Sequence, residues 1–215
     1  MIKTILFDIN GVVISVHIPT VCTNFANRIG ISPEFIIEQD KQNLERLLIG
    51  DMSLQEFFEI IRRELKDKNQ DLITIWREEG LKATAVNNEL LDLIKVLKQR
   101  YTVGILSNVT PLRSTIDQEL KIYEHFDFAL LSFQEHLKKP DPKFYQLACE
   151  KSNSQPEEIF YIDDREKYIA AAREFGMQGA VFLDNKCTAE LLGKIEEKIR
   201  SHHHLRRGQY LNKQS

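Results

Sequence analysis

Cysteine is scarce in this sequence, and the few thiols lie far apart. The 215 residues include only Cys22, Cys149 and Cys187, and no two of them form a CxxC pair. A disulfide framework needs paired cysteines, so this number and spacing argue against one. We therefore expect reduced thiols in a reducing compartment, which favours a cytoplasmic location.

Long apolar runs and an excess of basic residues are also missing. No hydrophobic stretch reaches the roughly 20 residues that a membrane-spanning helix needs, so we expect no membrane partner. Lysine and arginine total 29 against 32 acidic residues, and the resulting net charge of -3 does not favour nucleic acid as a partner. The chain starts in strand-like sequence, so we expect no secretory leader.

The sequence does contain enough apolar material for a folded core. Hydrophobic residues make up 42% and charged residues 28%, a balance that excludes disorder over most of the length. The length allows one domain, or one domain with a modest insertion. The first segment, from Ile2 to Phe7, is short and apolar and ends at Asp8. This pattern predicts a strand that is buried on both faces of a parallel sheet.

A helical stretch follows the first strand, from about Pro19 to Glu79. Ser32 and Pro33 predict a helix start, with the serine as N-cap and the proline at the first helical position. Ser53 and Glu56 have the spacing of a capping box and predict a second start. Apolar residues then recur at helical spacing and define a buried face, namely Leu54, Phe57, Phe58, Ile61 and Leu65.

Strand-like and helical segments alternate through the rest of the chain. Predicted strands cover residues 102–106, 126–131, 159–162 and 180–183. Predicted helices cover residues 88–100, 111–120, 142–151, 165–175 and 189–200. This alternation is typical of right-handed βαβ crossovers, so we expect an α/β fold with a doubly wound, Rossmann-like parallel sheet. Residues 201–215 are polar, and we expect a mobile tail there.

Polar residues stand where several predicted strands end. They are Asp8 and Asn10 after the first strand, Ser107 and Asn108 after the second, Lys139 in the loop after the third, and Asp163 and Asp164 after the fourth. Ligands of open α/β sheets bind at the carboxyl ends of the strands. Carboxylates that crowd together repel one another unless a cation is present, and Mg²⁺ suits such an all-oxygen site. We therefore expect a Mg²⁺ site that also accepts a phosphate.

These residues lie in four motifs, Phe7–Val12, Leu106–Asn108, Lys139–Pro142 and Tyr161–Asp164. With these motifs in this order, the chain resembles the haloacid dehalogenase superfamily, in its branch of Mg²⁺-dependent phosphohydrolases. The resemblance implies a Rossmann-like core formed by residues 1–16 and 80–200. It also implies that residues 17–79 form a small α-helical cap, which closes over the site and sets the choice of substrate.

The resemblance further implies a role for each motif residue. Asp8 would be the nucleophile that forms an aspartyl-phosphate. Ser107 and Asn108 would bind the phosphoryl group, and Lys139 would offset the charge of Asp8 and of the phosphate. The metal ligands would be Asp8, the backbone carbonyl of Asn10, Asp163, and Asp164 directly or through water. The expected substrate is a small phosphorylated metabolite.

Asn10 departs from the pattern of the family's phosphatases, which usually have an aspartate two positions after the nucleophile. An amide cannot donate and recover a proton, so a general acid–base contribution of about 10²–10⁴-fold is missing. Three interpretations follow: a slow phosphatase or one for good leaving groups, a catalytically silent phosphate-binding or regulatory relative, or an engineered change from aspartate. Dehalogenation of 2-haloacids is a further alternative, but the Asp163–Asp164 pair argues against a metal-free site.

Overall fold

The computed structural model describes residues 1–193 of the chain. Five strands form the main sheet, and all its neighbouring pairs are parallel, in the order β5-β4-β1-β6-β7. Their bounds are β1 Thr4–Phe7, β4 Thr102–Ser107, β5 Phe128–Leu131, β6 Ile159–Asp163 and β7 Gln178–Val181. The expected α/β fold with a doubly wound, Rossmann-like sheet is confirmed. Residues 194–215, which include the predicted tail, lie outside the described residues.

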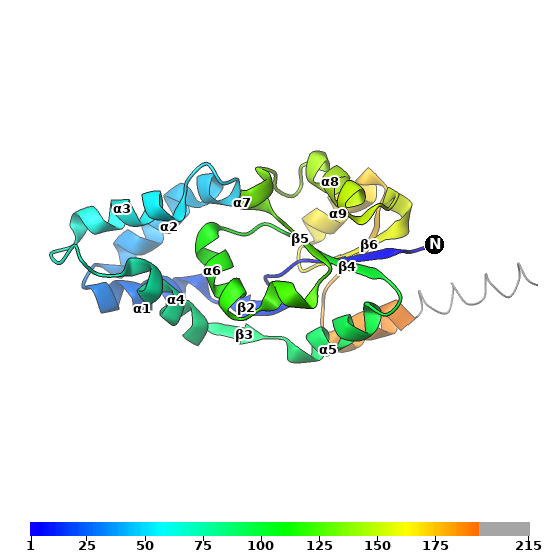
Figure 1. Cartoon of the computed structure of the whole chain (residues 1–215), viewed down its shortest axis with the longest axis horizontal. Coiled ribbons are helices and arrows are strands. Elements are labelled where there is room, and N and C mark those ends of the chain that lie inside the picture. Colours follow the sequence, from blue (N-terminus) through cyan, green and yellow to red (C-terminus); the bar gives the residue numbers. More distant parts are fainter. Residues whose placement is uncertain (194–215) are drawn as a thin grey trace, which may run out of the picture.

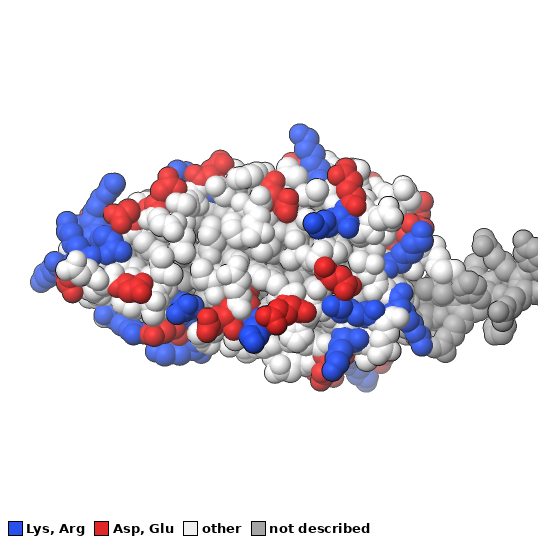
Figure 2. All heavy atoms as spheres, in the orientation of Figure 1, with Lys and Arg blue, Asp and Glu red and all other residues white. Residues whose placement is uncertain are grey.

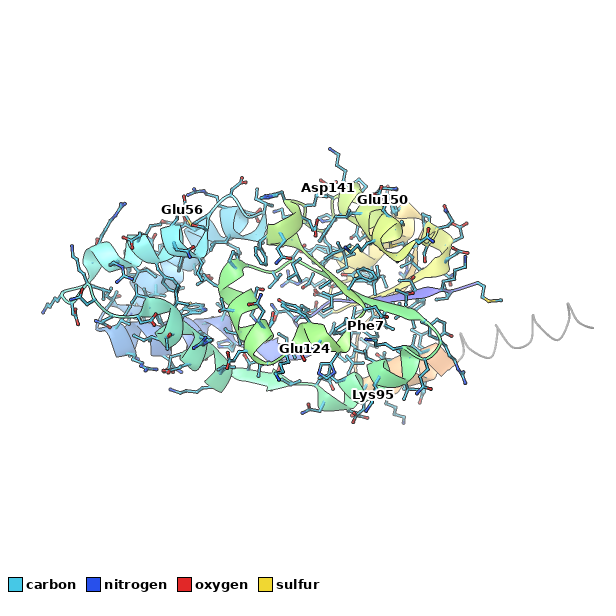
Figure 3. All side chains as sticks on the ribbon, viewed as in Figure 1. Phe7, Glu56, Lys95, Glu124, Asp141 and Glu150 are labelled. Carbon is cyan, nitrogen blue, oxygen red and sulfur yellow. The ribbon has the colours of Figure 1, made fainter. Side chains whose placement is uncertain are left out.

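Helices cover both faces of this sheet because the strand residues alternate between two cores. Ile5 and Phe7 of β1 join the core under α5 (Asn88–Leu97), whereas Leu6 joins the core under α8 (Pro142–Ser152) and α9 (Glu166–Phe175). Figure 3 shows Phe7 inside the sheet layer, while Glu150 on α8 lies at the surface. The helices that belong to the sheet layer are α5 Asn88–Leu97, α6 Pro111–Glu119, α7 Ser132–Glu135, α8 Pro142–Ser152 and α9 Glu166–Phe175, with short 3-10 turns at η1 Ile122–His125 and η2 Pro156–Glu158.

Four helices are inserted between β2 Ile14–Val16 and β3 Thr84–Val86, and they occupy the left end of the molecule in Figure 1. They are α1 Ile18–Ile29, α2 Pro33–Leu48, α3 Leu54–Glu64 and α4 Leu72–Lys82. We call them the helical segment. Both predicted helix starts are confirmed: Ser32 caps α2, and Ser53 with Glu56 forms the capping box of α3. The predicted apolar face is buried around Phe57, Phe58 and Ile61 in a separate core.

Contacts between α4 of the helical segment and α6 connect the helical segment to the sheet layer, and Leu112 and Ile116 of α6 belong to the same core as Trp76. The Trp76 indole donates to the Leu112 carbonyl (3.3 Å). Gly80 lies so close to α6 that a Cβ placed there would be 2.1 Å from Ile116 Cδ1. On the face shown in Figure 2, charged side chains of both signs lie mainly near the rim, and much of the centre is uncharged. No helix within residues 1–193 has the length and apolar character needed to cross a bilayer.

Several element boundaries differ from those predicted. The antiparallel pair β2 and β3 was not predicted, because each strand has only three residues and they meet only through the folded chain. β7 begins at Gln178 and ends at Val181, two residues earlier than predicted, because Gln178 already pairs with Phe160 in the sheet. The last described helix starts at residue 185 and not at 189, since the Asp184 side chain accepts a hydrogen bond from the Cys187 amide (2.7 Å) and caps it.

Candidate active site

The sheet register brings the ends of β1 and β6 together. Phe7 pairs with Ile162, and the Asp8 amide donates to the Ile162 carbonyl (2.9 Å). The chain runs outward from β1 through β4 to β5 and then returns to the other side of β1 at β6. The space between β1 and β6 is therefore the switch point of the sheet, where ligands bind in open α/β folds.

Three carboxylates converge at this point. Asp8, Asp163 and Asp164 each place one carboxylate oxygen within 4.8 Å of the others. Asp8 and Asp163 are buried, whereas Asp164 lies at the surface of the pocket. Gly11 makes room for this arrangement, because a Cβ there would be 2.4 Å from Asp164 Oδ2 and the residue has a φ of +80°. The predicted cluster of acidic residues is therefore formed by the fold.

Lys139 lies between two of these carboxylates and is itself buried. Its Nζ is 3.0 Å from Asp8 Oδ1 and 2.6 Å from Asp163 Oδ2. The Asn108 side chain holds the lysine backbone from both sides, accepting from the Lys139 amide (2.8 Å) and donating to its carbonyl (3.0 Å). One lysine faces three carboxylates, so this end of the pocket carries a net negative charge that a cation would offset.

The electrostatics of the cluster favour protonation of its acids when no cation is bound. Burial raises the pKa of the Asp8 carboxyl, the positive charge of Lys139 opposes this effect, and the charge of Asp163 adds to it. Burial also raises the pKa of Asp164 to about 6, with further contributions from Asp8 and Asp163. Two carboxyls with raised pKa values in one cleft are typical of a functional site.

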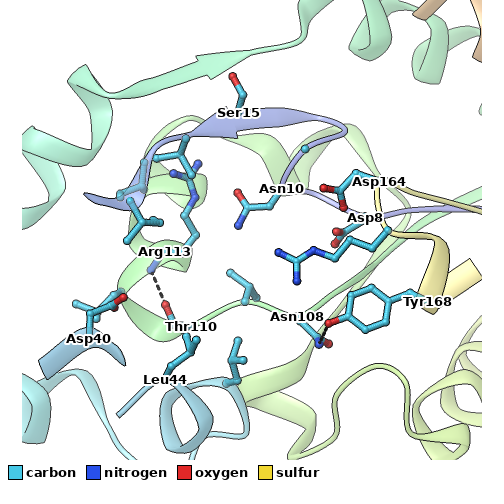
Figure 4. Close-up of a pocket in the computed structure, with 18 of the residues that line it drawn as sticks. Asp8, Asn10, Ser15, Asp40, Leu44, Asn108, Thr110, Arg113, Asp164 and Tyr168 are labelled. Carbon is cyan, nitrogen blue, oxygen red and sulfur yellow. Dashed lines mark hydrogen bonds between the residues drawn. The ribbon is translucent and has the colours of Figure 1, made fainter. Parts of the chain in front are cut away.

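Three buried oxygens at the site lack a well-aligned hydrogen bond among residues 1–193. They are the Asn10 amide oxygen Oδ1 and the Ser107 hydroxyl oxygen Oγ, and a third is Asp8 Oδ1, which forms an ion pair with Lys139. Buried polar groups are normally satisfied, so unpartnered atoms beside a cleft indicate a place for water or ligand. Ser107 also lies close enough to lower the pKa of Asp8 by hydrogen bonding. In Figure 4, Asn10 points into the pocket beside Asp8.

Tyr161 belongs to the site, although sequence analysis did not identify it. Its hydroxyl accepts from Lys139 Nζ (2.6 Å) and donates to the Asp163 carboxylate. Burial and the nearby charges of Asp8 and Asp163 raise the pKa of this phenol well above its usual value, so it stays a donor. The sequence spacing of Tyr161 and Asp163 could have identified it. Residues two apart on a strand point to the same face of the sheet, so Tyr161 is expected on the same face as Asp163.

Arg165 is a second residue that sequence analysis missed, because it was assigned only to the start of a helix. Its backbone amide donates to Asp163 Oδ1 (2.8 Å), and its side chain lines the pocket. The guanidinium lies 5.9 Å from the centre of the Tyr168 ring. The site therefore contains a cation in addition to the buried lysine.

The pocket extends from these carboxylates to the helical segment and has a volume of about 530 Å³. Its walls include Asn10, Asn108, Thr110 and Arg113 from the sheet layer, and Asp40, Leu44 and Trp76 from α2 and α4. Figure 4 shows Asp8 and Asp40 on opposite sides of this space. A volume of this size suits a small organic ligand.

Comparison with known proteins agrees with this architecture. Residues 2–176 match the family model for a haloacid dehalogenase-like hydrolase. A family enzyme from Bacteroides thetaiotaomicron, solved in complex with magnesium and inorganic phosphate, superposes with a TM-score of 0.73 at 22% identity, covering 86% of this chain and 96% of that one. At this identity, the superposition establishes the fold.

Two curated relatives are similar in sequence. The Rhythmically expressed gene 2 protein of Drosophila melanogaster is 36% identical over 53% of this chain and 45% of its own length. The D-ribitol-5-phosphate phosphatase of Bacteroides thetaiotaomicron is 27% identical over 83% of this chain and 90% of its own. The chain spans less than half the length of the first curated relatives that it matches. Because the family model covers most of the chain, the protein belongs to the haloacid dehalogenase-like hydrolases.

Proposed function

We propose that this protein is a Mg²⁺-dependent phosphohydrolase that removes the phosphoryl group of a small phosphorylated metabolite through Asp8. The observation that carries the proposal is the cluster at the switch point, where oxygens of Asp8, Asp163 and Asp164 lie within 4.8 Å of one another. Relatives named as phosphatases, among them the D-ribitol-5-phosphate phosphatase, support the reaction class.

The donor set fits Mg²⁺. The cluster offers only oxygen ligands, carries a net negative charge and opens on the pocket, as a site that also holds a phosphate requires. The ligands would be Asp8, Asp163, Asp164 and the Asn10 backbone carbonyl. A bound Mg²⁺ would neutralise part of the phosphate charge, so that an anionic oxygen can approach phosphorus.

The residues of the chain then have separate tasks. An Asp8 oxygen attacks phosphorus, the bond to the ester oxygen breaks, and the phosphoryl group passes to Asp8. Lys139 offsets negative charge on Asp8 and on the phosphoryl oxygens, and the Ser107 hydroxyl donates to one of these oxygens. Asn108 is the positioning residue for Lys139. Water later attacks phosphorus, which releases phosphate and restores the Asp8 carboxylate.

Asn10 limits the rate of phosphoryl transfer to Asp8 and the rate of hydrolysis of the phospho-enzyme. Its amide can hydrogen-bond the leaving oxygen or a water, but it cannot transfer a proton to either. The leaving oxygen then takes its proton from solvent, which favours substrates with good leaving groups, such as acyl phosphates. The Arg165 side chain, which lines the same pocket, supplies positive charge near the phosphate.

Residues 17–79 would act as the cap. Asp40, Leu44 and Trp76 in this part of the chain line the pocket that begins at Asp8, so the helical segment forms the wall opposite the carboxylates. We infer that this wall contacts the leaving group and sets the choice of substrate.

A second candidate function rests on Asn10. A chain that lacks the general acid and base can bind phosphorylated ligands without turnover, and it would then serve as a phosphate-binding or regulatory protein. The same metal and phosphate contacts would be used, but phosphate would not be released.

One experiment separates the two functions. Hydrolysis of an aryl phosphate is measured with and without Mg²⁺ for the parent chain, Asn10→Asp and Asp8→Asn. Turnover by the parent that requires Mg²⁺ and disappears in Asp8→Asn supports the enzyme. An inactive parent with an active Asn10→Asp supports the silent relative. Equal rates in all three variants would contradict a role for Asp8. Halide release from a chloroacid in the presence of chelator tests dehalogenation separately.

A further inference from the structure

The carboxylate of Asp40 faces the active-site pocket without a partner. Asp40 lies on α2, is partly buried, and makes no hydrogen bond or ion pair with any residue in the described range 1–193. Burial alone raises its pKa, so its environment does not stabilise its charge. A carboxylate in this setting gains most from a hydrogen-bond donor brought by a ligand.

Among residues 1–193, no cation forms an ion pair with Asp40. Arg113 lines the same pocket, but its guanidinium pairs with Asp117 (2.8 Å) and donates to Thr84 Oγ1 (3.0 Å). Arg165 lies at the other end, beside Asp164 and the Tyr168 ring. The other titratable group close to Asp40 is the Cys22 thiol on α1, where burial and the charge of Asp40 raise the pKa to about 12. That thiol is neutral and cannot pair with the carboxylate.

An apolar wall lies beside Asp40 on the same helix face. Leu44 and Leu48 follow Asp40 at spacings of four and eight residues, and both line the pocket. Leu44 is 37% exposed, so its side chain is accessible to a ligand in the pocket. The pocket therefore has a charged end at Asp8, an apolar middle and an acidic far end.

We propose that Asp40 selects phosphate esters whose leaving group carries a hydrogen-bond donor, an ammonium or hydroxyl group, at the end remote from the phosphate. This inference rests on the proposed phosphohydrolase function. The phosphate lies at Asp8, the carbon chain lies against Leu44 and Leu48, and the terminal donor binds the Asp40 carboxylate. An ammonium group is favoured over a hydroxyl, because its hydrogen bond to a carboxylate joins two opposite charges.

The test uses linear phosphate monoesters of equal chain length that end in ammonium, hydroxyl or methyl. For the parent with Mg²⁺, kcat/KM is expected to be about 10-fold or more higher for the ammonium ester than for the methyl ester, as one charge-assisted hydrogen bond predicts. Asp40→Asn should raise KM for the ammonium ester and leave kcat nearly unchanged. Asp40→Leu should reverse the preference in favour of the methyl ester.

Glu38→Gln is the matched control, because Glu38 is an exposed acid on the same helix that does not line the pocket. It should leave all three values of kcat/KM unchanged. Equal kcat/KM for the three esters in the parent would overturn the inference. So would a parallel change for all three esters in Asp40→Asn, since that result indicates a merely structural role.

If the parent hydrolyses no ester, the proposed function fails, but the inference is still tested by binding. Trp76 is the only tryptophan of the chain and lines the pocket, so its emission reports ligand binding. Tighter binding of the ammonium ester than of the methyl ester, weakened by Asp40→Asn, would support the role of Asp40. Equal binding of the two esters would contradict it.

Discussion

Asn108 and Lys139 are joined by a reciprocal pair of hydrogen bonds, from the Lys139 amide to Asn108 Oδ1 (2.8 Å) and from Asn108 Nδ2 to the Lys139 carbonyl (3.0 Å). One side chain at the end of β4 thus fixes the backbone of a loop that comes after β5. The loop in turn delivers the buried ammonium to Asp8 and Asp163. The Asn108 side chain therefore contacts the lysine backbone, and the phosphate-binding role that the resemblance implies for this residue stays a prediction.

Asn108→Ala removes both hydrogen bonds. We expect kcat/KM for a phosphate ester to fall by about 10–100-fold, since small displacements of a charged group are costly in phosphoryl transfer. Asn27→Ala, which changes an exposed asparagine on α1, is the control and should keep the parental rate. An unchanged rate in Asn108→Ala would show that Lys139 is held by other contacts.

Tyr161→Phe removes the hydroxyl that lies between Lys139 and Asp163. We expect a reduction in kcat of about 3–10-fold with the fold retained, because the lysine keeps its two carboxylate partners but loses one hydrogen bond of about 1–2 kcal/mol. Tyr145→Phe is the matched control, because its hydroxyl donates to the Tyr168 backbone carbonyl (3.0 Å) and contacts neither Lys139 nor Asp163. A larger loss of activity in the control than in Tyr161→Phe would count against this role.

The raised pKa of Asp164 predicts how stability depends on pH. A carboxyl whose pKa is about 6 in the fold and about 4 in the unfolded chain binds its proton more tightly when folded. Its ionisation therefore lowers the free energy of unfolding as the pH rises from about 4 to about 6, and the loss is complete above that range. Asp164→Asn should raise the Tm of the metal-free protein near neutral pH and have little effect near pH 4.

With Mg²⁺ bound, we expect the parent to be more stable than Asp164→Asn, the opposite of the order in the metal-free proteins. A ligand that binds only the folded state at about 100 times its Kd adds about 2.7 kcal/mol to the free energy of unfolding. We expect Mg²⁺ to raise the Tm of the parent more than that of Asp164→Asn. Asp92→Asn, an exposed substitution on α5, should respond to Mg²⁺ as the parent does. Equal Mg²⁺ responses in the parent and Asp164→Asn would exclude Asp164 from the metal site.

Sequence patterns predicted the parts of the fold that local chemistry determines. Continuous apolar runs that end in Asp8 and Asp163 predicted buried parallel strands, and the register of β1 and β6 places these two ends side by side. Ser32 and Ser53 predicted their helix starts because capping depends on residues within one turn.

Other parts depend on contacts between distant segments and could not be predicted in this way. The short strands β2 and β3 gain their order only from pairing with each other. Tyr161 was predicted only as part of a strand motif. Its ring packs in the core, but its hydroxyl contacts Lys139, which lies in a loop whose position the strand pattern does not predict. The sequence around Asp40 did not indicate a functional role, because the proposed role depends on how α2 lies against the pocket.

The most direct test of the central claim is acid quench of the Mg²⁺-loaded protein during turnover, followed by mass measurement of the peptide that contains Asp8. Asn10 cannot activate water, so the phospho-enzyme should accumulate on Asp8 in the parent and decrease in Asn10→Asp, whose steady-state rate should be higher. Phosphate release with no phosphoryl group on Asp8, together with unchanged turnover in Asp8→Asn, would contradict the account.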